Sequence, residues 1–367
     1  MSNDGRMIVI ADDITGAAEI AGIAFSQGQQ VRLVCGGLLC RDNVAAQTTV
    51  IATDTRSMSE AEAAAETRRI ASLYRGEVEG GLLFKKTDSA LRGHVIAELS
   101  ALMETTGFQR AVYLPANPSK GRVIRGGTYY INNVPVHETN FSFDPEFPAK
   151  TSDLRARFPN AESKGIIMSD AETICDIRRV VALYHDGKTL FAGAADLFTV
   201  LLESDEEAGV GRTSSRLCDI GKSTLILCGS TQSKPLEIDI PIAPLPQTVY
   251  DGSDDLSLWD TTAYQQQHNI ILTIPHTHRT GKEVATHLRS VMATMTRRLV
   301  EFHRPDHLII EGGATAWAVL NALGWTQFDV VRQIAPGVVQ MRAESGSLVT
   351  LKPGSYPWGP MFQSFSE

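Results

Sequence analysis

The stretch RMIVIADDITGAAEIAGIAFSQG, residues 6–28, decides the fold. Residues 6–11 are almost all apolar and predict a buried strand. Residues 15–28 carry apolar residues at helical spacing and end at Gly28, which predicts a helix. Two adjacent carboxylates, Asp12 and Asp13, stand between the strand and the helix. The stretch therefore predicts a strand followed directly by a helix, with acidic side chains at the turn.

The same alternation of strand and helix continues beyond this stretch. Further strands are expected at 30–35, 48–53, 81–86 and 110–116, and helices at 59–75 and 95–103. Ser59 and Glu62 form a capping-box pattern at the start of the first of these helices. Alternation of this kind is typical of parallel strands joined by crossover helices. Residues 121–139 break it, because they are short, β-branched and aromatic runs, and they predict antiparallel strands or an extended excursion.

The length of the chain predicts two domains. At 367 residues it exceeds the size at which a single hydrophobic core usually stops growing. A polar segment at 203–222 precedes a second alternating set, with strands at 224–229 and 270–275, a helix at 282–302, and a strand and helix within 307–324. The expected fold class is α/β, with domains 1–215 and 216–367. Each domain is expected to hold a mostly parallel sheet with flanking helices, and the active site is expected in the cleft between the domains.

Composition excludes several classes of partner. The formal net charge of −8, with acidic and basic residues mixed along the chain, argues against nucleic acid or an anionic membrane as the main partner. No apolar run reaches the about 18 residues of a membrane span. The five cysteines include no C-x-x-C pair, which argues against a disulfide framework. We expect a cytoplasmic protein that binds neither nucleic acid nor membrane, and a homo-oligomer stays open.

Three strand ends in the first domain carry charged side chains. Ligands of open parallel sheets bind beyond the carboxyl ends of the strands, where the following helices present free amides. The charged side chains at these ends include Asp12, Asp13, Arg56, Lys85, Lys86, Asp88 and Arg92. Such a mixture suits a phosphate or carboxylate together with sugar hydroxyls. An ordinary helix cap at one aspartate and a solvated ion pair are the structural alternatives.

Glycine turns recur in the second domain. CGSTQSKP at 228–235 and EGGATA at 311–316 each follow a predicted strand, and LKPG at 351–354 is a further glycine turn near the end. Glycine lets the backbone approach a phosphate closely, and Thr315 can cap a helix or bond an oxygen, although paired glycines also make ordinary tight turns. No G-x-G-x-x-G follows any strand, which weakens the case for a dinucleotide site.

Together these segments resemble a known family. IADDITGAAE, KKTDSALRG, LPANPSKGRVIRGGTYYINNVPVHET followed by DPEFP, GGATAWAVLNALG and the terminal KPG look like the four-carbon acid sugar kinases. That family includes the D-threonate, D-erythronate and 3-oxo-tetronate kinases, and the resemblance spans nearly the whole chain. It implies an acid-sugar-binding domain at 1–215 and a nucleotide-binding domain at 216–367. It also implies ATP as the phosphoryl donor, with Mg²⁺.

The resemblance assigns residues to the two ligands. It places Asp12, Asp13, Thr15, Lys86, Asp88 and Arg92 on the sugar side, and Arg56 joins them from its strand end. It places Ser230, Gly312, Gly313, Ala314 and Thr315 on ATP, with Gly354 closing over the nucleotide. Glu19 stands where the family commonly has aspartate, so the charge is kept on a longer arm.

The expected reaction is phosphorylation of a terminal hydroxyl of a four-carbon acid sugar: threonate, erythronate or 3-oxo-tetronate. Asp88 is the expected base, with Asp12 as its rival. Arg92 or Lys86 would hold the substrate carboxylate or the migrating phosphoryl group. An NAD-dependent oxidoreductase and a non-catalytic acid-sugar-binding protein stay open as alternatives.

Overall fold

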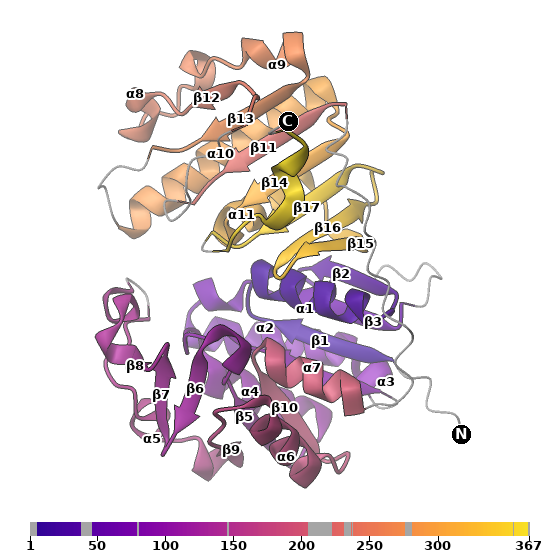
Figure 1. Cartoon of the computed structure of the whole chain (residues 1–367), viewed down its shortest axis with the longest axis vertical. Helices are drawn as coiled ribbons and strands as arrows, with labels where there is room; N and C mark the ends of the chain where they lie inside the picture. The colour runs from indigo at the N-terminus through magenta and orange to yellow at the C-terminus, as the bar shows by residue number, and fades with distance from the viewer. Residues whose placement is uncertain are drawn as a thin grey trace. The chain divides into compact units, whose positions relative to one another are not determined.

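The structure, a computed structural model, describes residues 6–37, 46–78, 81–144, 147–204, 222–230, 236, 238–275, 281–354 and 356–365. The chain divides into two compact units, Met1–Gly211 and Arg212–Glu367 (Figure 1). Each unit holds a mostly parallel sheet with helices, which confirms the predicted fold class. The predicted boundary between residues 215 and 216 lies outside the described residues and stays a prediction.

The sheet of the N-terminal unit is parallel throughout its described strands, in the order β2-β3-β1-β4-β10-β5-β9. The strands are β1 (Met7–Ala11), β2 (Val31–Cys35), β3 (Thr48–Ala52), β4 (Leu82–Lys86), β5 (Arg110–Leu114), β9 (Ile166–Met168) and β10 (Thr189–Gly193). The chain runs from β1 to β2 and β3 on one side and then crosses to β4 on the other. β1 therefore lies at a reversal of strand order, where open parallel sheets bind their ligands.

Helices cover both faces of this sheet. On one face, α1 (Ile14–Ser26) packs against α7 (Ala195–Ser204), which also contacts α6 (Ile174–Tyr184). On the other, α2 (Glu60–Leu73) packs against α4 (Val95–Thr106) (Figure 1). The capping box predicted from Ser59 and Glu62 is present at the start of α2. The short helices α3 (Arg75–Val78) and α5 (Leu154–Arg157) complete the α-helices of this unit in the described part of the chain.

The segment that breaks the alternation forms a small antiparallel sheet, as one of the two predictions had it. Its strands are β6 (Arg122–Arg125), β7 (Thr128–Ile131) and β8 (Val134–Pro135). Gly126 and Gly127 turn the chain between β6 and β7 with φ of 55° and 73°, a left-handed conformation that favours glycine. Asp170 accepts hydrogen bonds from both of their N–H groups, at 2.6 and 2.9 Å, which fixes the turn.

The sheet of the C-terminal unit has the order β12-β13-β11-β14-β17-β16-β15. The strands are β11 (Thr224–Cys228), β12 (Ile242–Pro244), β13 (Asn269–Thr273), β14 (His307–Glu311), β15 (Gln327–Ala335), β16 (Val338–Ala343) and β17 (Leu348–Lys352). β16 runs antiparallel to both β15 and β17, while the other pairs in that order are parallel. The antiparallel part was not predicted, although Gly337 and Gly346, both at positive φ, mark its two turns.

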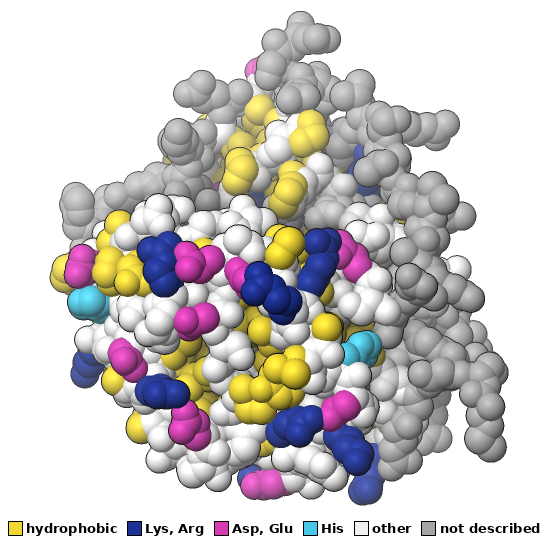
Figure 2. Space-filling model, turned by 60° about the horizontal axis from the view of Figure 1, so that its bottom comes forward, with side chains coloured by type: hydrophobic (Ala, Val, Ile, Leu, Met, Phe, Trp, Pro, Cys, Tyr) yellow, Lys and Arg dark blue, Asp and Glu magenta, His cyan; other side chains and the backbone are white. Residues whose placement is uncertain are grey.

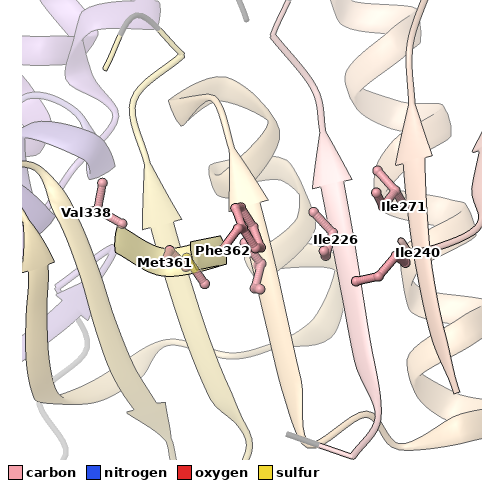
Figure 3. Close-up of a cluster of buried hydrophobic side chains, with 7 residues drawn as sticks. Ile226, Ile240, Ile271, Val338, Met361 and Phe362 are labelled. Atoms are coloured by element: carbon pink, nitrogen blue, oxygen red, sulfur yellow. The ribbon is translucent and has the colours of Figure 1, made fainter. Parts of the chain in front are cut away.

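The helices of this unit are α8 (Gln247–Tyr250), α9 (Thr262–Gln267), α10 (Lys282–His303) and α11 (Gly313–Leu323), and α10 packs along α11. The C-terminal segment also contributes to the core of this unit. Met361 and Phe362, on η7 (Gly359–Phe365), pack against Ile226 of β11 and other buried side chains (Figure 3). Burying such side chains stabilises the fold by about 1.5–3 kcal/mol each.

The distribution of charged side chains on the surface agrees with the mixture of acidic and basic residues along the sequence. On the face that Figure 2 shows, acidic and basic side chains lie next to one another instead of gathering by sign. Among the described residues, no helix combines the length and apolar character needed to cross a membrane.

Candidate active site

Arg56 draws the three charged turns of the N-terminal unit together. Its guanidinium nitrogens lie 2.9 Å from Oδ2 of Asp12, 3.2 Å from Oδ1 of Asp13 and 3.6 Å from Oδ1 of Asp88. These groups follow β3, β1 and β4, which are neighbours in the sheet. The turns that the sequence singled out therefore form one cluster at the carboxyl edge of the sheet.

Asp13 and Asp12 are adjacent in the chain, but their carboxylates have different hydrogen-bond partners. The side chain of Asp13 caps α1: it accepts hydrogen bonds from the Gly16 N–H at 2.9 Å and from the Thr15 hydroxyl at 2.6 Å. Asp12 uses only Oδ2 on Arg56, and its Oδ1 is buried with no hydrogen-bond partner in the described part of the chain. One carboxylate is thus a helix cap, and the other keeps an oxygen for another group.

Asp88 is surrounded by donors. Its Oδ2 accepts from the backbone N–H of Ala90 at 2.9 Å and of Arg92 at 3.2 Å. The guanidinium of Arg92 adds a bidentate pair, with Nε and Nη2 each 2.9 Å from a different carboxylate oxygen. This arrangement holds the turn after β4 in shape and keeps Asp88 ionised.

The protonation of the three aspartates follows from these partners. Burial raises the pKa of Asp12 above its usual value, although Arg56 opposes the shift. Burial also acts on Asp13, but Arg56 and the hydroxyl of Thr15 bring its pKa below the usual value. The pKa of Asp88 lies well below its usual value, because Arg92 and Arg56 outweigh the effect of burial. Asp12 is therefore the aspartate of this cluster that holds a proton most readily.

Two lysines share one glutamate beside this cluster. Lys86 Nζ lies 3.6 Å from Glu19 on α1, and Lys120, after β5, forms an ion pair with the same carboxylate. Sequence reasoning assigned no role to Lys120, because its contact with Glu19 joins residues far apart in the chain. Lys85 was expected to add charge to the site, and its charge does act on Asp12, where it opposes the rise of the pKa, but its ammonium forms its ion pair elsewhere. Adjacent strand residues face opposite sides of a sheet, and Lys85 is buried in an ion pair with Glu98, at 2.6 Å.

The glycine turns of the C-terminal unit also converge. They follow β11, β14 and β17, which are adjacent in the sheet. A Cβ added to Gly354 would lie 2.1 Å from the Ser230 hydroxyl, and one added to Gly229 would lie 2.2 Å from the Thr315 hydroxyl. Gly312 has φ of 98°, which an L side chain rarely adopts. The three turns therefore pack closely against one another and require glycine, the residue that also lets a backbone approach a phosphate.

Gly313 and Ala314 are the first two residues of α11, where the backbone N–H groups have no partner within the helix. All six residues predicted for ATP are thus in the three turns or in the first turn of α11. Their role in binding stays a prediction.

A buried ion pair that the sequence reasoning missed supports these turns. Glu311, the last residue of β14, pairs with Lys352, the last residue of β17, and both side chains are almost completely buried. Lys352 Nζ also donates to the carbonyls of Pro353 at 2.9 Å and Gly354 at 3.2 Å. The available signal was a charged residue ending each of two otherwise apolar strands, HLIIE and LVTLK.

Comparison with known proteins gives the family. A model of a sugar-binding N-terminal domain matches residues 7–174, and a model of a nucleotide-binding C-terminal domain matches residues 246–356. A D-threonate kinase of Salmonella typhimurium is 24% identical over 90% of this chain and 89% of its own length. A 3-oxo-tetronate kinase of Brucella melitensis is 25% identical over 96% of this chain and 93% of its own. This chain belongs to the four-carbon acid sugar kinase family.

The family membership makes the chain a kinase, a phosphotransferase with an alcohol group as acceptor, and implies the use of ATP. A D-erythronate kinase of Heliobacterium modesticaldum is 30% identical over 45% of this chain and 37% of its own. Solved structures of proteins from Haemophilus influenzae and Salmonella typhimurium share the fold of this kinase, with TM-scores of 0.71 and 0.73. They are 19% and 18% identical to it and cover 98% and 99% of its chain, and 99% and 98% of their own.

Proposed function

We propose that this kinase transfers the γ-phosphoryl group of ATP to a terminal hydroxyl of a four-carbon acid sugar of the threonate, erythronate or 3-oxo-tetronate class. The curated relatives carry these substrates in their names, and the D-threonate and 3-oxo-tetronate kinases match nearly the whole chain. The charged cluster of the N-terminal unit supports an acidic, hydroxylated substrate, and the glycine turns of the C-terminal unit support a nucleotide.

One observation carries the proposal: Asp12 is a buried carboxylate with a raised pKa and an oxygen that no described group engages. A general base must reach the hydroxyl proton and must bind that proton well enough to take it. Asp12 meets the second requirement, whereas five donor contacts from Ala90, Arg92 and Arg56 occupy Asp88. We therefore assign the base to Asp12 and give Asp88 the task of holding the turn.

In the proposed reaction the hydroxyl oxygen of the acid sugar forms a bond to the γ-phosphorus of ATP. The bond from that phosphorus to the β–γ bridging oxygen breaks, ADP leaves, and Asp12 receives the hydroxyl proton. Positioning and charge neutralisation supply most of the catalysis in such transfers. Lys86 and Arg56, both close to Asp13, supply positive charge beside the base.

Mg²⁺, if bound together with ATP, would neutralise part of the charge of the phosphates. The described residues contain no group of three or more His, Cys, Asp or Glu side chains that could hold a metal ion. Kinases usually bind Mg²⁺ through substrate phosphates and one or two carboxylates, so such a group is not required. In this chain Asp13, which shares the guanidinium of Arg56 with Asp12, could supply one such carboxylate.

The proposal is tested by coupled ADP release with a panel of acid sugars that contains D- and L-threonate, D- and L-erythronate and their 3-oxo forms. We expect ATP-dependent turnover of at least one four-carbon acid, with kcat/KM above that of five- and six-carbon aldonates. Turnover of none of them, with an increase in melting temperature on adding a tetronate but not ATP–Mg²⁺, would indicate a non-catalytic binding protein. A spectral change on titration with NADH would favour the oxidoreductase instead.

A further inference from the structure

Arg122 stands out among the cations around the N-terminal cluster because of what it contacts. It begins β6, in the antiparallel excursion, and donates a hydrogen bond to the hydroxyl of Ser89, on the turn that follows β4. Its guanidinium also stacks over the ring of Phe141, 6.0 Å from the centroid. In the part of the chain that the structure describes, no carboxylate pairs with it. Arg122 is half-buried, so it is placed to bind an anion that comes from solution.

The other cations of the site are already engaged. Arg56 contacts three carboxylates, and Arg92 forms a bidentate pair with Asp88 and a longer one with Asp144, at 3.4 Å. The two lysines share Glu19. The guanidinium of Arg157, on α5, donates hydrogen bonds to the backbone carbonyls of Leu91 and Pro148.

The negative and positive charges of the ion pairs around the N-terminal cluster are equal in number. Its four central carboxylates match four cations in number, and Asp144 and Arg157 add one further charge of each sign. The central groups are Asp12, Asp13, Glu19 and Asp88 with Arg56, Lys86, Arg92 and Lys120. A bound acid sugar adds a negative charge, so it needs a further cation if it is to be held in a partly buried site. Arg122 is the described cation that remains for this role.

The position of Arg122 would also set the orientation of a bound acid sugar. Asp88 and Ser89 are consecutive, yet Asp88 contacts Arg56 beside Asp12, while the Ser89 hydroxyl contacts Arg122. A carboxylate placed at the Asp12 end would meet other carboxylates and be repelled. At the Arg122 end it would meet a guanidinium and a hydroxyl, which form the bidentate and charge-assisted hydrogen bonds that carboxylates favour.

Phe141 gives this end of the site its shape. The guanidinium groups of Arg92 and Arg122 both lie against its ring, at 5.6 and 6.0 Å from the centroid. Stacking restricts where a guanidinium plane can lie and leaves its edge free to bond an anion. Tyr129, buried on β7, donates its hydroxyl to the Ser89 carbonyl and so holds the facing turn in place.

We propose that Arg122, with the hydroxyl of Ser89, binds the carboxylate of the acid sugar and makes the enzyme specific for acids over neutral sugar alcohols. The inference rests on the proposed function and deepens it, since it fixes which end of the substrate lies at which end of the turn. The hydroxyl to be phosphorylated then lies at the Asp12 end. Arg122 is a binding residue in this scheme and takes no part in proton transfer.

The test compares Arg122→Gln, Arg122→Lys and a matched control, Arg125→Gln, in the full-length enzyme. Arg125 lies on the same strand, but it is exposed and pairs with Glu172, at 2.7 Å. For the best acid of the panel, we expect Arg122→Gln to raise KM about tenfold or more, since a charge-assisted hydrogen bond is lost. The KM for ATP should change less than about twofold. Arg122→Lys should recover part of the loss, and Arg125→Gln should match the wild type.

A second measurement separates this inference from the proposed function. Calorimetric titration with D-threonate and D-erythronate, without ATP, needs no turnover, and the matching tetritols serve as neutral ligands. We expect the wild type to bind the acid at least about tenfold more tightly than the tetritol, and Arg122→Gln to lose this preference. An unchanged preference in a folded Arg122→Gln variant, or a wild type without any preference, would overturn the inference. Turnover of no acid by the wild type would instead refute the proposed function, and the titration would still decide the role of Arg122.

Discussion

Asp12 and Asp13 are identical neighbours in the chain, yet the structure gives them opposite pKa shifts. Asp13 caps α1 and lies against Arg56, so its pKa falls, whereas burial raises the pKa of Asp12. A capping pattern alone could not say which of the two caps the helix. The difference comes from where β1 ends and α1 begins, a detail that only the folded backbone fixes.

The first prediction at this scale concerns Asp12→Asn. If Asp12 accepts the hydroxyl proton, its replacement by an amide should lower kcat about a hundredfold or more, in line with general-base contributions. The KM for ATP should stay close to that of the wild type. Asp88→Asn is the comparison, because it removes charge from the same cluster without removing the proposed base. A larger loss of kcat in Asp88→Asn than in Asp12→Asn would return the base to Asp88.

The pH profile supplies an independent readout for the same residue. Asp12 must be ionised to accept a proton, so kcat/KM should fall as the pH falls through its pKa. Because burial raises that pKa, the acidic limb should lie above the about 3.9 of an ordinary aspartate. The residual activity of Asp12→Asn should lack this limb, and a limb that persists there unchanged would belong to another group.

At the scale of elements, the C-terminal site depends on how closely three turns approach. The turns after β11, β14 and β17 leave no room for a side chain at Gly354, where a Cβ would meet the Ser230 hydroxyl at 2.1 Å. Contacts as close as this cannot be read from a glycine in the sequence. They follow from the pairing of β14 with both β11 and β17.

Gly354→Ala should therefore displace Ser230 and weaken ATP binding. We expect the KM for ATP to rise about tenfold, with little change in the KM for the acid sugar. Gly76→Ala is a matched control, because a Cβ there meets nothing within 4 Å. Equal effects of the two substitutions would show that the crowding at Gly354 has no bearing on the nucleotide.

The ion pair between β14 and β17 gives a prediction about stability. Lys352→Met would leave Glu311 buried without its cation, which costs about 3–5 kcal/mol in comparable sites. The melting temperature should fall, and adding Glu311→Gln should recover part of the loss, because the unpaired charge is then gone. Calorimetry on both variants and the double variant measures the coupling. A melting temperature unchanged by Lys352→Met would mean that the pair does not support the turns.

At the scale of the whole molecule, the two units share one design. In each unit the first strand, β1 or β11, has the next two strands of the chain on one side of it in the sheet and the fourth strand on the other side. Polar or glycine turns follow the strands at this reversal of strand order. The alternation of strands and helices in the sequence was enough to predict parallel strands joined by crossover helices, since apolar runs of strand length and helical spacing report on burial directly. The order of the strands, and so the reversal, came from the structure. The strands β15, β16 and β17 were not among the predicted elements, and their antiparallel pairing could not be read from apolar runs, which carry no record of strand direction.

By itself the sequence determined the fold class, most of the strands and helices, the capping box of α2 and the turns that carry the charged and glycine residues. These are local properties, set by spacing and by propensity within a few residues. Only the tertiary structure decided that Asp13 is the cap and Asp12 keeps an oxygen unengaged, that Lys85 pairs with Glu98, and that Arg122 meets Ser89. Such facts depend on contacts between residues far apart in the chain, and burial and charge pairing act through those contacts alone.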